Sequence, residues 1–97
     1  MIEQNGAGLA VKGPMLIANA SALLETGRSF LRGAAPASEV LLDLAAVEET
    51  DSSALSVIFG LLRTAQQRGL TLRLAHAPAS MLSQAALYGV TESLPLA

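Results

Sequence analysis

Strand-like and helix-like segments alternate along this chain of 97 residues, and this alternation is the feature that most limits its fold. Short apolar or alternating runs predict three strands, at 8–12, 39–44 and 70–74. Helical spacing of apolar residues predicts three helices, at 20–31, 52–68 and 78–89. Such an order is typical of α/β layers with helices packed on a sheet. A chain of this length supports one core, so we expect a single domain over residues 1–97, with a loosely packed tail after residue 90.

The composition argues against several kinds of partner and site. The 6 Lys and Arg residues are scattered, the net charge is −2 and aromatic residues make up 3%, so we expect no nucleic-acid binding. Cysteine is absent and there is one histidine, which excludes disulfides and thiol chemistry and argues against a zinc site. No apolar run approaches the ~20 residues of a membrane span, and residues 1–8 lack the pattern of a signal peptide. We therefore expect a cytoplasmic protein without direct membrane insertion.

The low share of charged residues bears on the surface. Hydrophobic residues make up 52% of the chain and charged residues 14%, so much of the surface must be small, neutral or apolar. A partner protein often covers part of such a surface. An alanine-rich sequence with ordinary drift explains the same numbers, and composition alone leaves both interpretations open.

No catalytic or cofactor-binding motif is recognisable. His76 has no nucleophile or acid in a matching element, so we interpret it as a turn or surface residue. Gly6 and Gly8 precede their strand and form no dinucleotide fingerprint, and no GxxxxGK[ST] loop occurs. We interpret Asp43 as a loop cap and Tyr88 as a core residue with a hydrated hydroxyl. We expect no enzymatic activity, no cofactor and no metal.

The most specific stretch runs from Asp43 to Gly69: an apolar strand, a polar loop, a serine-rich helix start and a long helix that ends at glycine. A helix start carries unpaired N–H groups and a partial positive charge. Asp51 or Ser52 can cap it, and capping alone is one interpretation of both residues. The other interpretation is that an exposed serine hydroxyl here meets a partner protein. A phosphate on it would be held by the same N–H groups, although the neighbouring acidic residues would repel it.

The helix predicted at 52–68 has two different faces on a helical wheel. One face carries larger apolar side chains and is expected to meet the core: Leu55, Ile58, Phe59, Leu62 and Ala65. The opposite face is small and nearly uncharged: Ser53, Ser56, Val57, Gly60, Thr64 and Gln67. Water alone can solvate such a face, but a mid-helix glycine costs about 1 kcal/mol relative to alanine. We therefore favour the hypothesis that this outer face contacts a partner.

The same stretch resembles the STAS family, named for sulfate transporters and anti-sigma-factor antagonists. The resemblance rests on Asp43-Leu44 at the strand end and on the run Asp51-Ser52-Ser53-Ala54-Leu55, in which Ala54 replaces the usual glycine. The C-terminal Leu87-Tyr88-Gly89-Val90 and Leu94-Pro95 are similar to the end of MlaB-type STAS proteins. The resemblance implies a small STAS-type α/β domain, with a mixed β-sheet and helices packed on it.

Resemblance to MlaB-type proteins implies a non-catalytic subunit that binds and supports the ATPase of a phospholipid ABC transporter, which maintains outer-membrane lipid asymmetry. The protein would then be peripheral to the inner membrane through its partner. The position that matches Ser52 is a threonine important for this role in MlaB-type proteins. Together with the helix face described above, the expected partner-binding residues are Asp51, Ser52, Ser53, Ser56, Val57, Gly60 and Thr64.

Resemblance to anti-sigma-factor antagonists implies a different role. In those proteins a serine kinase, which is the anti-sigma factor, phosphorylates the loop at the position that matches Ser53. Since this chain has hydroxyls at both Ser52 and Ser53, the motif leaves either serine open to phosphorylation. The C-terminal match favours the transporter role. A small ligand-binding STAS domain ranks last, because low aromatic content provides little material for a specific pocket.

Overall fold

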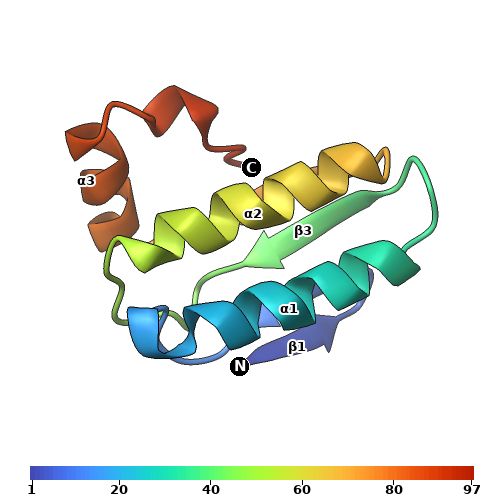
Figure 1. The fold of residues 1–97 in the computed structure, drawn as a ribbon, viewed down its shortest axis with the longest axis horizontal. Helices are drawn as coiled ribbons and strands as arrows, with labels where there is room; N and C mark the ends of the chain where they lie inside the picture. The colour runs from blue at the N-terminus through green and yellow to red at the C-terminus, as the bar shows by residue number, and fades with distance from the viewer.

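The computed structural model describes all residues from 1 to 97 and shows a mixed four-stranded sheet with three α-helices (Figure 1). The elements follow one another as β1 Ile2–Asn5, β2 Gly8–Val11, α1 Ile17–Gly33, β3 Glu39–Asp43, α2 Ser53–Gln67, β4 Thr71–Ala75, α3 Ala79–Leu87 and a short 3₁₀ helix, η1, at Thr91–Ser93. The strand order is β1-β2-β3-β4. β1 and β2 are antiparallel, whereas β2, β3 and β4 run parallel. The predicted α/β fold is confirmed.

The first strand, β1, was not predicted from the sequence. It pairs with β2 from Ile2 opposite Val11 to Asn5 opposite Gly8, so that Gly6 and Ala7 form a two-residue hairpin loop. Gly6 has a φ of 61°, a left-handed conformation that glycine adopts without steric cost. Glycine at the first position of a two-residue loop is typical of a type II′ hairpin turn, and Gly6 provided this signal in the sequence.

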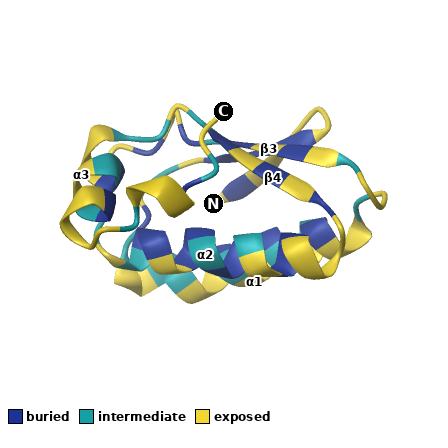
Figure 2. Ribbon diagram, turned by 90° about the horizontal axis from the view of Figure 1, so that it is seen from above, coloured by how far each residue is buried: buried dark blue, intermediate teal, exposed yellow.

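The helices α1 and α2 lie side by side on one face of the sheet (Figures 1 and 2). In β3 and β4 alternate residues are buried, as expected for a sheet with one covered face. The covered face supplies Leu42 and Leu74, whereas Leu41 on the other face is 42% exposed. The core therefore lies between the sheet and the helix pair. No helix in the structure is both long enough and apolar enough to span a bilayer.

The predicted outer face of α2 is wrong for three of its residues. Val57, Gly60 and Thr64 are buried, because α1 packs along that side of α2. An added Cβ at Gly60 would lie 2.7 Å from Leu24 Cδ1, so the glycine permits the close approach of the two helices. Thr64 Oγ1 accepts a hydrogen bond from Arg28 Nε at 3.3 Å. The glycine that suggested a docking surface is explained by packing within the domain.

The C-terminal tail is ordered against the sheet, which corrects the expectation of loose packing. Leu96 forms a parallel bridge with Leu74 of β4. The N–H of Leu74 donates to Pro95 O, and the N–H of Ala97 donates to Leu74 O, both at 2.8 Å. Leu94 is buried in the core. The tail therefore covers part of the free edge of β4.

Candidate functional site

The side chain of Asp51 joins the starts of two helices. Its Oδ2 accepts the N–H of Ile17, the first residue of α1, at 2.9 Å, and its Oδ1 accepts the N–H of Ser53, the first residue of α2, at 2.8 Å. The backbone oxygen of Asp51 also accepts the N–H of Ala54. Hydrogen bonding by Ile17 is the largest cause of a lowered pKa for the Asp51 carboxyl, followed among the lowering effects by bonding to Ser53. One carboxylate thus satisfies donors at both positive helix ends.

A short backbone pairing holds this loop in place. Met15 and Thr50 form a parallel bridge, in which Met15 N–H donates to Glu49 O at 2.9 Å and Asp51 N–H donates to Met15 O at 3.2 Å. Met15 itself is buried. The chain that enters α1 and the chain that enters α2 are therefore fixed to each other before either helix begins.

Ser52 is exposed and its hydroxyl makes no hydrogen bond, so of the two residues that could cap α2, Asp51 does so. Ser53 is half-buried, and Ser56, one turn along α2, is exposed. Asp51, Ser52, Ser53 and Ser56 thus lie together at the start of α2. Val57, Gly60 and Thr64 lie instead on the side of α2 that α1 covers.

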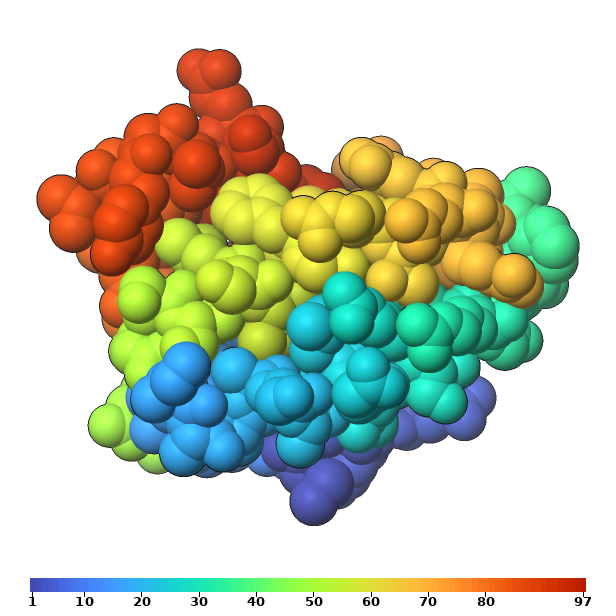
Figure 3. Space-filling view, in the orientation of Figure 1, coloured from blue at the N-terminus to red at the C-terminus, as the bar shows by residue number.

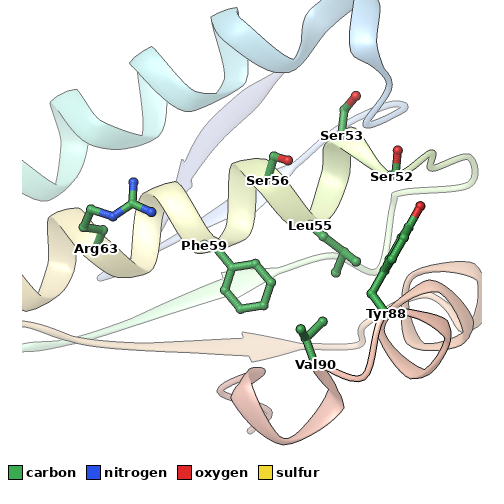
Figure 4. A pocket seen from close by; sticks show the side chains of 8 residues that line it. All are labelled: Ser52, Ser53, Leu55, Ser56, Phe59, Arg63, Tyr88 and Val90. Carbon is green, nitrogen blue, oxygen red and sulfur yellow. The ribbon is translucent and has the colours of Figure 1, made fainter.

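An open groove of about 580 Å³ runs beside the serines, between α2 and the segment that follows α3. Figure 3 shows the hollow where the C-terminal segment meets the first half of α2. It is lined by Ser52, Ser53, Leu55, Ser56, Phe59, Arg63, Tyr88 and Val90. In Figure 4, Phe59, Leu55 and Val90 gather on one side of the groove, the Tyr88 hydroxyl points towards Ser52, and Arg63 lies farther along α2. The groove combines apolar side chains, hydroxyls and one cation.

Five lining residues were not predicted as part of a site: Leu55, Phe59, Arg63, Tyr88 and Val90. The interpretation of Tyr88 as a core residue is wrong, because its side chain is 59% exposed. Phe59 was assigned to the core and is half-buried. The signal available in the sequence was the single Arg at position 63 on an otherwise uncharged helix.

A second polar pair lies at the carboxyl ends of β3 and β4. Asp43 Oδ1 lies 3.0 Å from His76 Nδ1 and accepts the N–H of Ala45 at 2.9 Å. Hydrogen bonding by His76 and then by Ala45 lowers the pKa of the Asp43 carboxyl. His76 is exposed and has a φ of 57°. The contact joins the loop after β3 to the loop after β4, which confirms Asp43 as a loop cap and His76 as a surface residue. The structure contains no group of three or more potential metal-ligating side chains.

A family model described as the MlaB, STAS domain matches residues 2–96, which is nearly the whole chain. The chain belongs to this family. The part of the chain that matches the family model therefore runs from β1 to the tail that pairs with β4. Domains of this kind are in general non-catalytic binding or regulatory domains. None of the curated proteins matches the chain in sequence.

Solved structures of other STAS proteins have the same fold. An anti-sigma-factor antagonist (STAS) domain protein from Planctomyces limnophilus is 15% identical, with a TM-score of 0.76 over 99% of this chain and 86% of that one. An anti-sigma factor antagonist from Mycobacterium paratuberculosis is 18% identical, with a TM-score of 0.76 over 99% and 81%. A sulfate transporter family protein from Wolinella succinogenes is 16% identical, with a TM-score of 0.68 over 90% and 71%. At these identities the likeness shows the fold.

Proposed function

We propose that this STAS domain is a cytoplasmic subunit that binds and supports the ATPase of a phospholipid ABC transporter. The observation that carries the proposal is the groove at the start of α2, with the unbonded hydroxyl of Ser52 at one end, in a chain of the MlaB, STAS domain family. Through the ATPase the domain would be peripheral to the inner membrane. Asp51 positions the loop, while Ser52, Ser53 and Ser56 contact the partner.

The physical case for docking rests on exposed apolar surface beside these hydroxyls. Tyr88 is 59% exposed and Leu87 is 79% exposed, at the end of α3 that borders the groove. Apolar surface of this kind, rimmed by polar groups, is typical of a protein–protein contact. A tyrosine in such a position contributes a large contact area at a low cost in conformational entropy.

A second candidate is an anti-sigma-factor antagonist that is switched by phosphorylation of Ser52 or Ser53. The Planctomyces and Mycobacterium structures, both described as anti-sigma factor antagonists, favour it. Against it, the N–H of Ser53 is already bonded to the Asp51 carboxylate, which would repel a phosphate on the neighbouring hydroxyl. Ser52, which is exposed and unbonded, is the more accessible of the two to a kinase.

Affinity purification of the intact protein from its native host separates these functions. Mass spectrometry should identify an ABC transporter ATPase with the domain, and unmodified Ser52 and Ser53. Recovery of a serine-kinase anti-sigma factor together with a phosphoserine in the domain would establish the second candidate instead.

Contact through the groove can be mapped because the chain has no cysteine. A single Ser56→Cys variant, labelled with a photoactivatable cross-linker, should cross-link to the ATPase. Ser21→Cys, at an exposed position on α1, provides the matched control and should not. Equal cross-linking at both positions would mean that the groove is not the contact surface.

Ser52→Ala tests the hydroxyl itself. Because the Ser52 side chain is exposed and makes no capping bond, we expect the free energy of unfolding to change by less than about 0.5 kcal/mol. Binding of the ATPase should weaken by several-fold, as titration calorimetry would measure. A destabilised Ser52→Ala domain with normal affinity would make the residue structural.

A further inference from the structure

Arg63 is a free cation in the groove. The ion pairs of the domain join Arg28 with Glu25 and Arg73 with Glu39, Asp43 contacts His76, and none of these contacts includes Arg63. Its guanidinium makes no hydrogen bond within the domain, and its side chain is exposed. No acidic residue lines the groove. A chain with a net charge of −2 thus presents an isolated positive charge at the site where we propose that its partner docks.

The apolar part of the groove begins one helical turn from this cation. Phe59 and Arg63 are four residues apart in α2, so they project from the same side of the helix about 6 Å apart along its axis. Leu55 and Val90 continue the apolar wall beyond Phe59 (Figure 4). Ser52 and Ser53 mark the opposite end of the groove from Arg63. A segment lying along α2 would therefore meet hydroxyls, then apolar side chains, then a positive charge.

From this arrangement we infer that the partner inserts an acidic segment, in which an apolar side chain packs on Leu55, Phe59 and Val90 while a carboxylate about 6 Å farther along pairs with Arg63. This inference rests on the proposed function and names the chemistry of the docked segment. A guanidinium holds a carboxylate through two parallel hydrogen bonds, which fixes the direction and the register of the segment as well as adding affinity. Arg63 is thus a specificity-determining residue.

The number of positive charges in the groove favours an acidic protein segment over an anionic membrane surface as the bound partner. Attraction to anionic lipids generally requires clusters of about four to eight basic residues. Here one arginine lines the groove, and the protein as a whole is acidic. A single arginine is sufficient to select one carboxylate on a protein segment, and the apolar wall beside it supplies the contact area.

The test measures the affinity of the purified ABC transporter ATPase for three variants of the intact domain. Arg63→Glu should weaken binding by about tenfold or more, because the attraction becomes a repulsion, and Arg63→Gln should fall between it and the wild type. Arg32→Glu makes the same change of net charge at an exposed, unpaired position in the last turn of α1, and should bind within twofold of the wild type. The difference in affinity for the ATPase between Arg63→Glu and the wild type should become smaller at high salt, since salt screens exposed charges.

Cross-linking from Ser56→Cys then identifies the docked segment of the ATPase. That segment should contain an acidic residue, and changing this residue to lysine should restore the binding of the Arg63→Glu domain. Circular dichroism confirms that each variant is folded.

The outcomes separate the inference from the proposed function. If the ATPase binds the wild type and Arg63→Glu equally well, or if the cross-linked segment has no acidic residue, the inference is overturned while the proposed function stands. If the domain instead binds a serine-kinase anti-sigma factor through a contact that Arg63→Glu breaks and a charge exchange restores, the proposed function fails and the acidic segment is confirmed. If wild-type domain binds neither protein, both are overturned.

Discussion

Asp51 shows how one residue can be both predictable and unexpected. Its role at the start of α2 follows from local spacing, because Asp is a preferred capping residue and the N–H of Ser53, two residues later, is within its reach. Its second bond, to the N–H of Ile17, joins residues 34 positions apart and has no local signal. α1 begins at Ile17 rather than near residue 20, as the apolar spacing had predicted, and two side chains accept N–H groups there: Asp51 bonds Ile17 and Asn19 bonds Leu16.

The lowered pKa of Asp51 predicts an acid-sensitive domain. The carboxyl holds a proton less tightly in the folded state than in the unfolded state, where its pKa is about 4. It therefore contributes stability above about pH 4, and this contribution is lost as the pH falls towards the lower folded value. Asp51→Asn should reduce stability at pH 7, because an amide can accept from one of the two N–H groups only. It should also flatten the dependence on pH below about 4, because an amide does not ionise.

Urea denaturation at neutral and acidic pH measures both effects. Glu3→Gln, at an exposed position without a hydrogen bond or ion pair, is the control and should follow the wild type. Asp43, whose pKa is also lowered, should leave some acid dependence in the Asp51→Asn variant. An unchanged acid dependence in Asp51→Asn would show that ionisation of Asp51 is not coupled to folding, and an unchanged stability at pH 7 would show that the two-helix cap contributes nothing.

At the scale of the element, α2 was predicted well in extent and wrongly in orientation. A helix over 52–68 was expected and Ser53–Gln67 is observed, since periodicity and the terminal Gly69 are local signals. The interpretation of the helical wheel placed only one side of α2 against the core. In the structure α2 packs against both the sheet and α1, so the buried arc is wider and includes the face with Gly60 and Thr64. A wheel shows which residues share a face but not how many neighbours the helix has.

Packing of α1 on α2 makes Gly60 a site for a structural test. Gly60→Leu should destabilise the domain by about 2 kcal/mol, because the new side chain would overlap Leu24. Combining it with Leu24→Ala should cost less than the sum of the two single changes, since the smaller side chain leaves room. Gly33→Ala, where an added Cβ meets no atom within 4 Å, is the control.

Thermal and urea denaturation of the wild type, the two single variants and the double variant give the coupling free energy between positions 24 and 60. Additive losses in the double variant would contradict a direct contact between positions 24 and 60. Because Gly60 is buried against α1, a bulky residue there is expected to affect partner binding only through the loss of the fold.

Across the whole molecule, the tail completes the sheet edge. Deletion of residues 94–97 removes the buried Leu94 side chain and the backbone bonds to Leu74, and should destabilise the domain by about 2–3 kcal/mol. It also exposes more of the edge of β4, which should promote association between copies. Leu96→Ser, at a residue that is 43% exposed, retains the backbone bonds and serves as the control.

Urea denaturation and size-exclusion chromatography test the role of the tail. If the truncated domain were as stable and as monodisperse as Leu96→Ser, the tail would be dispensable for the fold.

The sequence by itself determined the order of the elements from β2 to α3, the start and end of α2 and the serines at that start, because each depends on residues within a few positions of one another. It left the cap open between Asp51 and Ser52, and the structure selected Asp51. The glycine in the loop of the β1–β2 hairpin was an equally local signal, although the hairpin was not predicted. Only the tertiary structure decided which face of α2 is free. α1 covers Gly60 from elsewhere in the chain, and Tyr88 and Val90 complete a groove with Ser52, Phe59 and Arg63. Such contacts bring together segments distant in sequence, and local patterns do not record where those segments meet.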